Sequence, residues 1–222
     1  MQSKQLRTTT GLATSIGSCW LTYQKGKKIN RVLDVGCGGG QEMLPFAEKT
    51  EAFCVGIDVA REVSTVGEKT FADAGFAGRC AFAVSKGEAL PLADESFDVV
   101  ICRVALPYMD NRQALAEISR VLKPDGTFFL KTHAPLFYFG MMRRRFKNLS
   151  AKQLAYPLIC LAGGTWNLLR GQHPRGVFWQ GKEVFQSKGY LHRELAKNNL
   201  RIADLLPDNN PETPSFLIVK NK

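Results

Sequence analysis

Five short apolar stretches in the first 131 residues have the length and composition of buried strands, and segments with helical patterns separate them. Strands that alternate with helices predict right-handed βαβ units and a parallel sheet. The predicted strands are Arg31–Val35, Ala52–Ile57, Cys80–Val84, Phe97–Cys102 and Thr127–Lys131, the helices between them are Gln41–Lys49, Ala60–Ala74 and Asn111–Leu122, and a leading helix is expected over Thr8–Tyr23.

The pattern changes after the fifth predicted strand. The segment Thr132–Gly181 mixes aromatic side chains with an arginine cluster and a long uncharged stretch. Regularity returns with a predicted helix over Glu183–Asn198 and predicted strands over Arg201–Leu206 and Ser215–Val219. Two strands joined by a Pro- and Asn-rich turn predict an antiparallel closing hairpin at a sheet edge.

Composition excludes several classes of protein. The chain has 222 residues, of which 45% are hydrophobic and 23% charged, so disorder, collagen and coiled coil are set aside. The net charge of +10 is unevenly distributed, because residues 1–132 carry 16 basic and 15 acidic side chains while residues 133–222 carry 14 and 5. A basic C-terminal third indicates an anionic substrate, a phospholipid surface or nucleic acid, or a solvated face without a partner.

Cysteine usage and the termini predict a cytoplasmic protein. Six cysteines show no CxxC pair, which favours reduced thiols, and the polar N-terminus lacks a secretory signal. The uncharged stretch Gln153–Leu169 contains Pro157 and two glycines, and it is too short and too broken to span a bilayer comfortably. Peripheral attachment to an anionic membrane surface through the basic third remains open.

A glycine-rich segment follows the first predicted strand. Asp34 is followed by four glycines within residues 36–40, and a helix is predicted next. Glycines there let a ligand lie against the backbone, and the helix start offers unpaired N–H groups. The dinucleotide fingerprint GxGxxG, started at Gly36, would need Gly or Ala where Gln41 stands, so nicotinamide or flavin binding is disfavoured without being excluded.

A second acid, Asp58, ends the second predicted strand 24 positions after Asp34. A carboxylate at that point can accept hydrogen bonds from both hydroxyls of a ribose, and an adenosine-containing cofactor requires such an acceptor. The alternative is that Asp58 only caps the next helix.

Five blocks in order and spacing resemble the class I S-adenosylmethionine-dependent methyltransferases, in particular the type 11 methyltransferase domain, which includes ubiquinone/menaquinone-biosynthesis-like enzymes. The blocks are Val32–Gly40, Gly56–Asp58, Glu88–Leu92, Ser96–Val100 and Ile118–Gly126. The resemblance covers residues 30–132 and implies S-adenosyl-L-methionine as cofactor. It also implies an α/β fold with a seven-stranded, mostly parallel Rossmann-like sheet, helices on both faces, an antiparallel last strand and a cap inserted after strand 5.

We therefore expect a single methyltransferase domain over residues 1–222. It would comprise an N-terminal helical segment (1–30), a cofactor-binding core (31–132), a cap insertion (133–182), and a C-terminal helix with the closing hairpin (183–222). Aromatic residues of the cap either line an apolar acceptor pocket or pack the cap onto the sheet, and both can hold at once.

The resemblance also implies cofactor roles for individual residues. Asp34 would anchor the loop and the cofactor's amino group, Asp58 would hold the ribose hydroxyls, and Val59 would pack on the adenine. Arg103 would lie beneath the methionine portion through its carbonyl. The loop residues that would border the methionine moiety and ribose are Gly36, Cys37, Gly38 and Gly40, and those expected on the pocket wall are Leu106 and Tyr108.

One residue departs from the family pattern. Lys86 stands where an acid usually accepts from the adenine amino group, and an ammonium has no acceptor capacity. Either Lys86 points outward while Ser85 or a carbonyl accepts, or adenine recognition rests on the backbone of Gly87 and on packing.

Methyl transfer mainly requires that the acceptor be held close to the methyl carbon while water is excluded. A general base matters only if the acceptor must lose a proton. His133, which follows strand 5 at the carboxyl edge, is the first candidate base, and Tyr108 is a second candidate catalytic residue. His173 and His192 are weaker candidates, and the spacing of the histidines predicts no metal site.

These observations favour a methyltransferase acting on a small apolar or aromatic acceptor. One alternative is an RNA methyltransferase that uses the basic C-terminal third, although nucleic acid is disfavoured because no RNA-binding module is visible. A further alternative is a non-catalytic cofactor-binding partner subunit, which the substitution at Lys86 supports.

Overall fold

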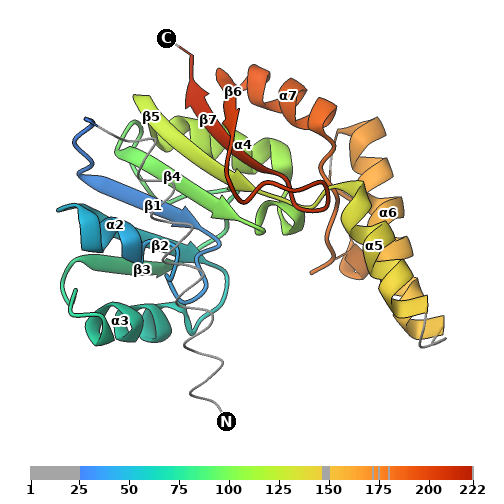
Figure 1. Cartoon of the computed structure of the whole chain (residues 1–222), viewed down its shortest axis with the longest axis horizontal. Helices are drawn as coiled ribbons and strands as arrows, with labels where there is room; N and C mark the ends of the chain where they lie inside the picture. The colour runs from blue at the N-terminus through green and yellow to red at the C-terminus, as the bar shows by residue number, and fades with distance from the viewer. Residues whose placement is uncertain (1–25, 147–150, 172, 175, 180, 222) are drawn as a thin grey trace.

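The computed structural model describes residues 26–146, 151–171, 173–174, 176–179 and 181–221. A seven-stranded sheet with the order β3-β2-β1-β4-β5-β7-β6 forms its centre (Figure 1). The strands are β1 Arg31–Val35, β2 Phe53–Asp58, β3 Cys80–Val84, β4 Phe97–Arg103, β5 Leu122–Lys131, β6 Leu200–Leu205 and β7 Ser215–Lys220. Strands β1 to β5 are parallel, and β7 is antiparallel to both β5 and β6. The predicted fold class is therefore confirmed.

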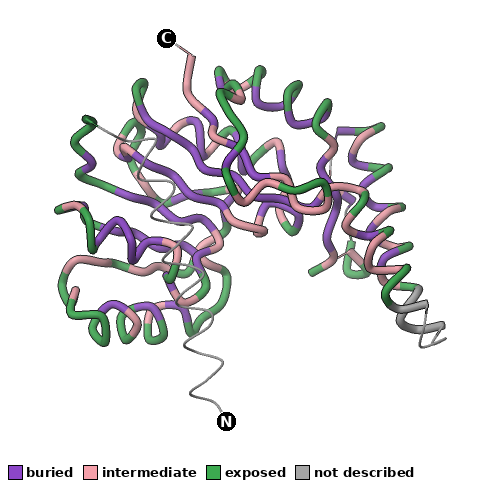
Figure 2. The backbone as a smooth tube through the Cα atoms, viewed as in Figure 1, coloured by how far each residue is buried: buried purple, intermediate pink, exposed green. Residues whose placement is uncertain are grey.

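Helices cover both faces of the sheet. They are α2 Leu44–Lys49, α3 Val63–Asp73, α4 Asn111–Val121, α5 Pro135–Phe146, α6 Ala151–Arg170 and α7 Lys188–Lys197, with 3-10 turns η1 Leu106–Tyr108 and η2 Val177–Trp179. Successive strand residues point to opposite faces, so Leu33 packs with α4 and α7 while Val32 packs with α2 and α3. The central strands β1, β2, β4 and β5 are consequently buried on both sides over most of their length, whereas the edge strands β3 and β6 are largely intermediate or exposed (Figure 2).

Strand β5 is longer than the predicted Thr127–Lys131. Its register against β4 jumps from Phe97↔Leu122 to Val99↔Thr127, so that residues 123–126 form an excursion inside the strand. This excursion contains the Pro-Asp-Gly sequence, whose turn chemistry explains why the sequence alone suggested a later start.

The predicted start of the last helix is wrong. Helix α7 begins at Lys188, where the Ser187 side chain accepts from the backbone N–H of Tyr190. Residues 183–186 instead form a buried segment tied to two other parts of the fold. Its Val184 N–H donates to the carbonyl of Pro107, and its Gln186 N–H donates to the carbonyl of His133. The helix predicted over Thr8–Tyr23 lies outside the described residues.

Helices α5 and α6 form a pair that projects beyond the carboxyl end of β5 (Figure 1). The uncharged stretch becomes most of α6, with Pro157 inside the helix. Gly163 and Gly164 let aromatic rings approach, since a Cβ at Gly164 would clash with the ring of Phe185. Among the described residues, no helix has the length and apolar content needed to cross a bilayer.

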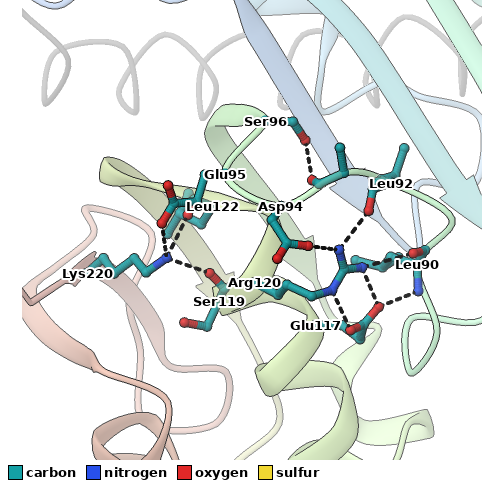
Figure 3. Close-up of polar contacts among 11 residues, drawn as sticks. Leu90, Leu92, Asp94, Glu95, Ser96, Glu117, Ser119, Arg120, Leu122 and Lys220 are labelled. Atoms are coloured by element: carbon teal, nitrogen blue, oxygen red, sulfur yellow. Dashed lines mark hydrogen bonds and ion pairs between the residues drawn. The ribbon is translucent and has the colours of Figure 1, made fainter.

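Arg120 of α4 fixes the segment between β3 and β4 (Figure 3). Its guanidinium donates to the carbonyls of Leu90 (3.0 Å) and Leu92 (2.7 Å). It also forms ion pairs with Asp94 (2.6 Å) and Glu117 (2.7 Å). These charge-assisted bonds satisfy backbone carbonyls of a segment that is not hydrogen-bonded to any strand of the sheet. The start of that segment borders the site described next.

Candidate functional site

Two adjoining cavities lie at the carboxyl edge of the parallel strands, where ligands of open α/β sheets bind. The smaller, of about 280 Å³, lies between the turn after β1, the end of β2 and the residues after β4. The larger, of about 590 Å³, lies between residues 86–88, the start of α4 and residues 173–181. Both are lined by Val59, Gly87, Tyr108 and Met109, so the cavities are contiguous.

The turn after β1 forms one wall of the smaller cavity. Gly36 has a positive φ of 80°, and a Cβ there would clash with Ala105. The N–H groups of Gly36 and Cys37 both donate to the carbonyl of Ile57, which ties the turn to β2. Of the four loop residues expected to border a ligand, Gly36 lines the cavity, while Cys37, Gly38 and Gly40 do not.

Asp58 stabilises this turn and lines the smaller cavity. Its Oδ2 accepts from the N–H of Gly38 at 2.9 Å, and its Oδ1 accepts from the N–H of Ala60 at 3.0 Å. Helix α3 begins later, with Glu62 at its N-cap position, so Asp58 does not cap it. A carboxylate has about four acceptor positions, and Asp58 therefore retains capacity for further donors.

Asp34 in β1 is buried, and neither of its carboxyl oxygens has a hydrogen-bond partner among the described residues. Burial, with Glu42 and Asp58 nearby, raises the pKa of Asp34 well above its usual value. The guanidinium of Arg103, which also lines the smaller cavity, pairs with Glu42 at 2.9 Å. The expected anchoring of the loop by Asp34 is not present as a hydrogen bond, and the site contains a buried carboxyl group whose desolvation has no compensating donor.

Cys37 lies beneath the turn rather than on the cavity wall. Its side chain is buried, and burial followed by the nearby Asp34 and Asp58 raises the pKa of the thiol far above its usual range. A neutral, buried thiol of this kind serves packing and is not a nucleophile.

The residues after β2 and β3 form the boundary between the two cavities. Val59 is two-thirds exposed and lines both, as does Gly87. Ser85 lines the smaller cavity, whereas Lys86 lines only the larger one. The Ser85 hydroxyl donates to the carbonyl of Ala89 at 3.0 Å, which leaves its oxygen free to accept.

Four donors converge on one buried carboxylate, Glu183, next to the larger cavity. Its Oε1 accepts from the hydroxyls of Tyr108 (2.8 Å) and Tyr156 (2.9 Å). Its Oε2 accepts from the Tyr138 hydroxyl (2.8 Å) and from Nδ1 of His133 (2.7 Å). Burial would raise the pKa of Glu183, but these hydrogen bonds outweigh it and lower the pKa to about 2.

This cluster contains both predicted catalytic residues, but only one of them reaches the cavities. Tyr108 lines both, and burial together with Glu183 raises its pKa, so its hydroxyl stays protonated. His133 lines neither; its ring stacks on Phe137 with centroids 3.8 Å apart. Glu183 was not among the predicted site residues, although it is the single acid between Asp125 and Glu194.

His173 lies on the wall of the larger cavity, together with Trp179. Its Nδ1 is 3.0 Å from the carbonyl oxygen of Pro174, and because a carbonyl only accepts, the proton of the neutral ring belongs on Nδ1. Its Nε2 then carries the lone pair and has no hydrogen-bond partner among the described residues. His192, the remaining candidate, is exposed on α7.

Comparisons with known proteins agree with this architecture. A family model described as a methyltransferase domain matches residues 33–130. The chain is 38% identical over 105 residues to an uncharacterized methyltransferase, YcgJ of Bacillus subtilis, covering 47% of this chain and 41% of that protein. It is 33% identical over 139 residues to the ubiquinone/menaquinone biosynthesis C-methyltransferase UbiE of Geotalea daltonii, covering 57% and 59% respectively.

The fold extends beyond the matched sequence. The crystal structure of magnesium protoporphyrin IX methyltransferase from Synechocystis PCC 6803, with bound SAH, superposes with a TM-score of 0.64 at 15% identity, covering 96% of this chain and 83% of that chain. The chain spans less than two thirds of the length of the curated relatives named above. Residues 33–130 therefore match the methyltransferase domain family, and the described chain has the sheet topology and fold of a solved methyltransferase.

Proposed function

We propose that the protein transfers the methyl group of S-adenosylmethionine to a small apolar or aromatic acceptor bound in the 590 Å³ cavity. The observation that carries the proposal is the continuity of the two cavities through Tyr108, Val59, Gly87 and Met109. A ligand in the smaller cavity would contact a second ligand in the larger one. The aromatic ring of Trp179 and the side chain of Val177 give the larger cavity an apolar wall.

The residues of the smaller cavity, together with Asp34, which is buried near it and does not line it, fit the cofactor. The partnerless buried carboxyl of Asp34 suits an ammonium group, because a positive donor would compensate its desolvation. The open acceptor positions of Asp58 suit two ribose hydroxyls. The missing side chain at Gly36 lets Ala105 pack against the turn, and both residues line the cavity. When bound, the cofactor supplies a methyl group on a cationic sulfur.

The remaining residues position the acceptor and handle its proton. The Tyr108 hydroxyl donates to Glu183, which holds it in one orientation. Its oxygen can then accept a hydrogen bond from the substrate that receives the methyl group, at the junction of the cavities. Trp179 restricts the access of water. Where the acceptor is a hydroxyl, a phenol or an acidic carbon, His173 rather than His133 takes the proton, because His173 lines the cavity. Its Nε2 is buried and without a partner among the described residues, so the ring must turn to present this atom to the acceptor.

Calorimetry with S-adenosylmethionine and S-adenosylhomocysteine tests cofactor binding, with NAD as comparison. We expect Asp58→Ala to weaken binding by about 1.5–3 kcal/mol, the range for hydrogen bonds to a charged group. Asp73→Ala is the matched control, since Asp73 pairs with Lys69 on the exposed surface of α3. Binding of NAD alone, or equal affinities in the Asp58 variant and the wild type, would contradict the proposal.

The acceptor is identified by incubating the protein with methyl-labelled cofactor and a cell extract, and then isolating the labelled product. A labelled small apolar or aromatic molecule is expected. Labelled RNA would overturn the proposal in favour of the RNA alternative, and tight cofactor binding without any labelled product would favour the partner subunit.

A further inference from the structure

Helix α6 exposes an apolar face to solvent. Ala155, Leu158, Ala162, Trp166 and Leu169 are all exposed, and Leu169 keeps 78% of its surface accessible. At about 100° per residue these five positions fall within an arc of about 80°. The opposite side of the helix is buried, as Cys160 and Asn167 show. Figure 2 shows buried and exposed residues alternating along α6. An apolar stripe with no covering element in the described structure marks an interaction surface.

The charge of the surrounding segment is of one sign. Residues 133–182 contain eight Lys and Arg residues and no Asp or Glu. Among them, Arg143, Arg144 and Arg170 are exposed at the C-terminal ends of α5 and α6. Arg144 pairs with Glu212 at 3.1 Å, whereas Arg143 and Arg170 form no ion pair within the described residues.

Aromatic and cationic groups meet at the end of the apolar stripe. The Arg170 guanidinium lies 5.1 Å from the centroid of the Trp166 ring, one helical turn away. In the segment after α6, Lys182 Nζ lies 4.0 Å from the centroid of the Phe178 ring, which belongs to η2 and is half-exposed. The indole of Trp166 is amphipathic, and such a ring beside a cation is typical of side chains that sit at the boundary between lipid and water.

We propose that the exposed face of α6, with Arg170, docks on an anionic lipid bilayer. Burial of Leu158, Trp166 and Leu169 among headgroups removes their apolar surface from water, and the acid-free segment 133–182 is attracted to anionic headgroups. A second copy of the chain would bring two such basic segments together, and their repulsion opposes a dimer through this face. Nucleic acid would satisfy the charge but leaves the aliphatic side chains of the stripe without a partner.

Cosedimentation of the full chain with vesicles tests the proposal. Vesicles of phosphatidylcholine are compared with vesicles that also contain phosphatidylserine, at low and high salt. We expect binding to the anionic vesicles that weakens with salt. Leu169→Ser should weaken it about tenfold, because one large side chain is no longer transferred from water, and Arg170→Gln about fivefold.

Matched substitutions elsewhere separate docking from general effects. Val66→Ser on α3 removes a half-exposed apolar side chain, and Lys49→Gln on α2 removes an exposed cation. Both controls should bind vesicles like the wild type. Lipids brominated on their acyl chains should quench tryptophan fluorescence in the wild type, and Trp166→Phe should lose most of that quenching while it still cosediments.

Three results would overturn the proposal. They are equal binding to neutral and anionic vesicles, equal losses in the Leu169 variant and the Val66 control, and a dimer in sedimentation velocity that Leu169→Ser abolishes. Tight, salt-sensitive binding of RNA without binding to anionic vesicles would overturn it as well. Cofactor affinity, measured in the same variants, should not change, since the α6 face does not border the smaller cavity.

Discussion

Replacing Glu183 with glutamine removes half of the acceptor capacity of the cluster that joins α5, α6 and η1 to the sheet. Each carboxylate oxygen of Glu183 accepts two hydrogen bonds, and a glutamine would present an NH₂ group to one pair of donors. The pair that faces the NH₂ group, either the buried His133 and Tyr138 or the part-buried Tyr108 and Tyr156, would lose its ionised acceptor. We therefore expect Glu183→Gln to be strongly destabilising.

The magnitude follows from the pKa of the carboxylate. The pKa of Glu183 is lowered from 4.5 to about 2 in the folded protein, and the side chain is only 7% exposed. At about 1.4 kcal/mol per pKa unit, the ionised group contributes about 3 kcal/mol at neutral pH. Because the folded pKa is the lower one, this contribution is complete above about pH 4.5 and is lost as the pH falls toward 2.

Urea unfolding followed by circular dichroism measures the effect. Glu183→Gln should lower the free energy of unfolding by about 3 kcal/mol at neutral pH, and the difference from the wild type should shrink below about pH 4.5. Glu48→Gln on the exposed side of α2 is the control and should change little. A variant as stable as the wild type at neutral pH, or a loss independent of pH, would refute the reasoning.

Two further predictions concern the site and its support. Arg120→Gln should lower the free energy of unfolding by about 2–3 kcal/mol and speed amide exchange over residues 88–96, because the carbonyls of Leu90 and Leu92 lose a charged donor. Denaturant unfolding and hydrogen exchange check this, and unchanged exchange there would contradict it. With the acceptor identified, His173→Gln should lower kcat more than S-adenosylhomocysteine affinity if the acceptor must lose a proton. A larger kcat loss in His133→Gln would return the base role to His133.

The positions of the strands could be predicted because each is encoded locally. β1 and β3 coincide with the predicted residues, β2 is shifted by one residue at both ends, and β4 is one residue longer at its C-terminal end. A short apolar run between two turn signals predicts a strand from its own residues alone, and such runs at the centre of a parallel sheet are buried on both faces. The glycine turn and Asp58 could be predicted for the same reason, since both come directly after the strands that position them.

Only the tertiary structure decided how the buried cluster beside the larger cavity is assembled. Tyr108, Tyr138, Tyr156 and His133 come from η1, α5, α6 and the end of β5, and no sequence period places four such segments around Glu183. The predicted helix included Glu183 because residues 183–186 have no turn signal of their own. Hydrogen bonds to Pro107 and His133, both distant in sequence, hold residues 183–186 in a buried, non-helical segment.

The two faces of α6 show the same division. The sequence determined that residues 153–169 carry no charge and are interrupted by Pro157 and glycines. Which side of the helix would be covered depended on Trp179 packing at Gly163 and Phe185 packing at Gly164. Hydrophobic burial is non-directional, so an apolar segment without a polar face predicts burial but does not specify which side is buried. The shape of the neighbouring elements decides which side remains in solvent.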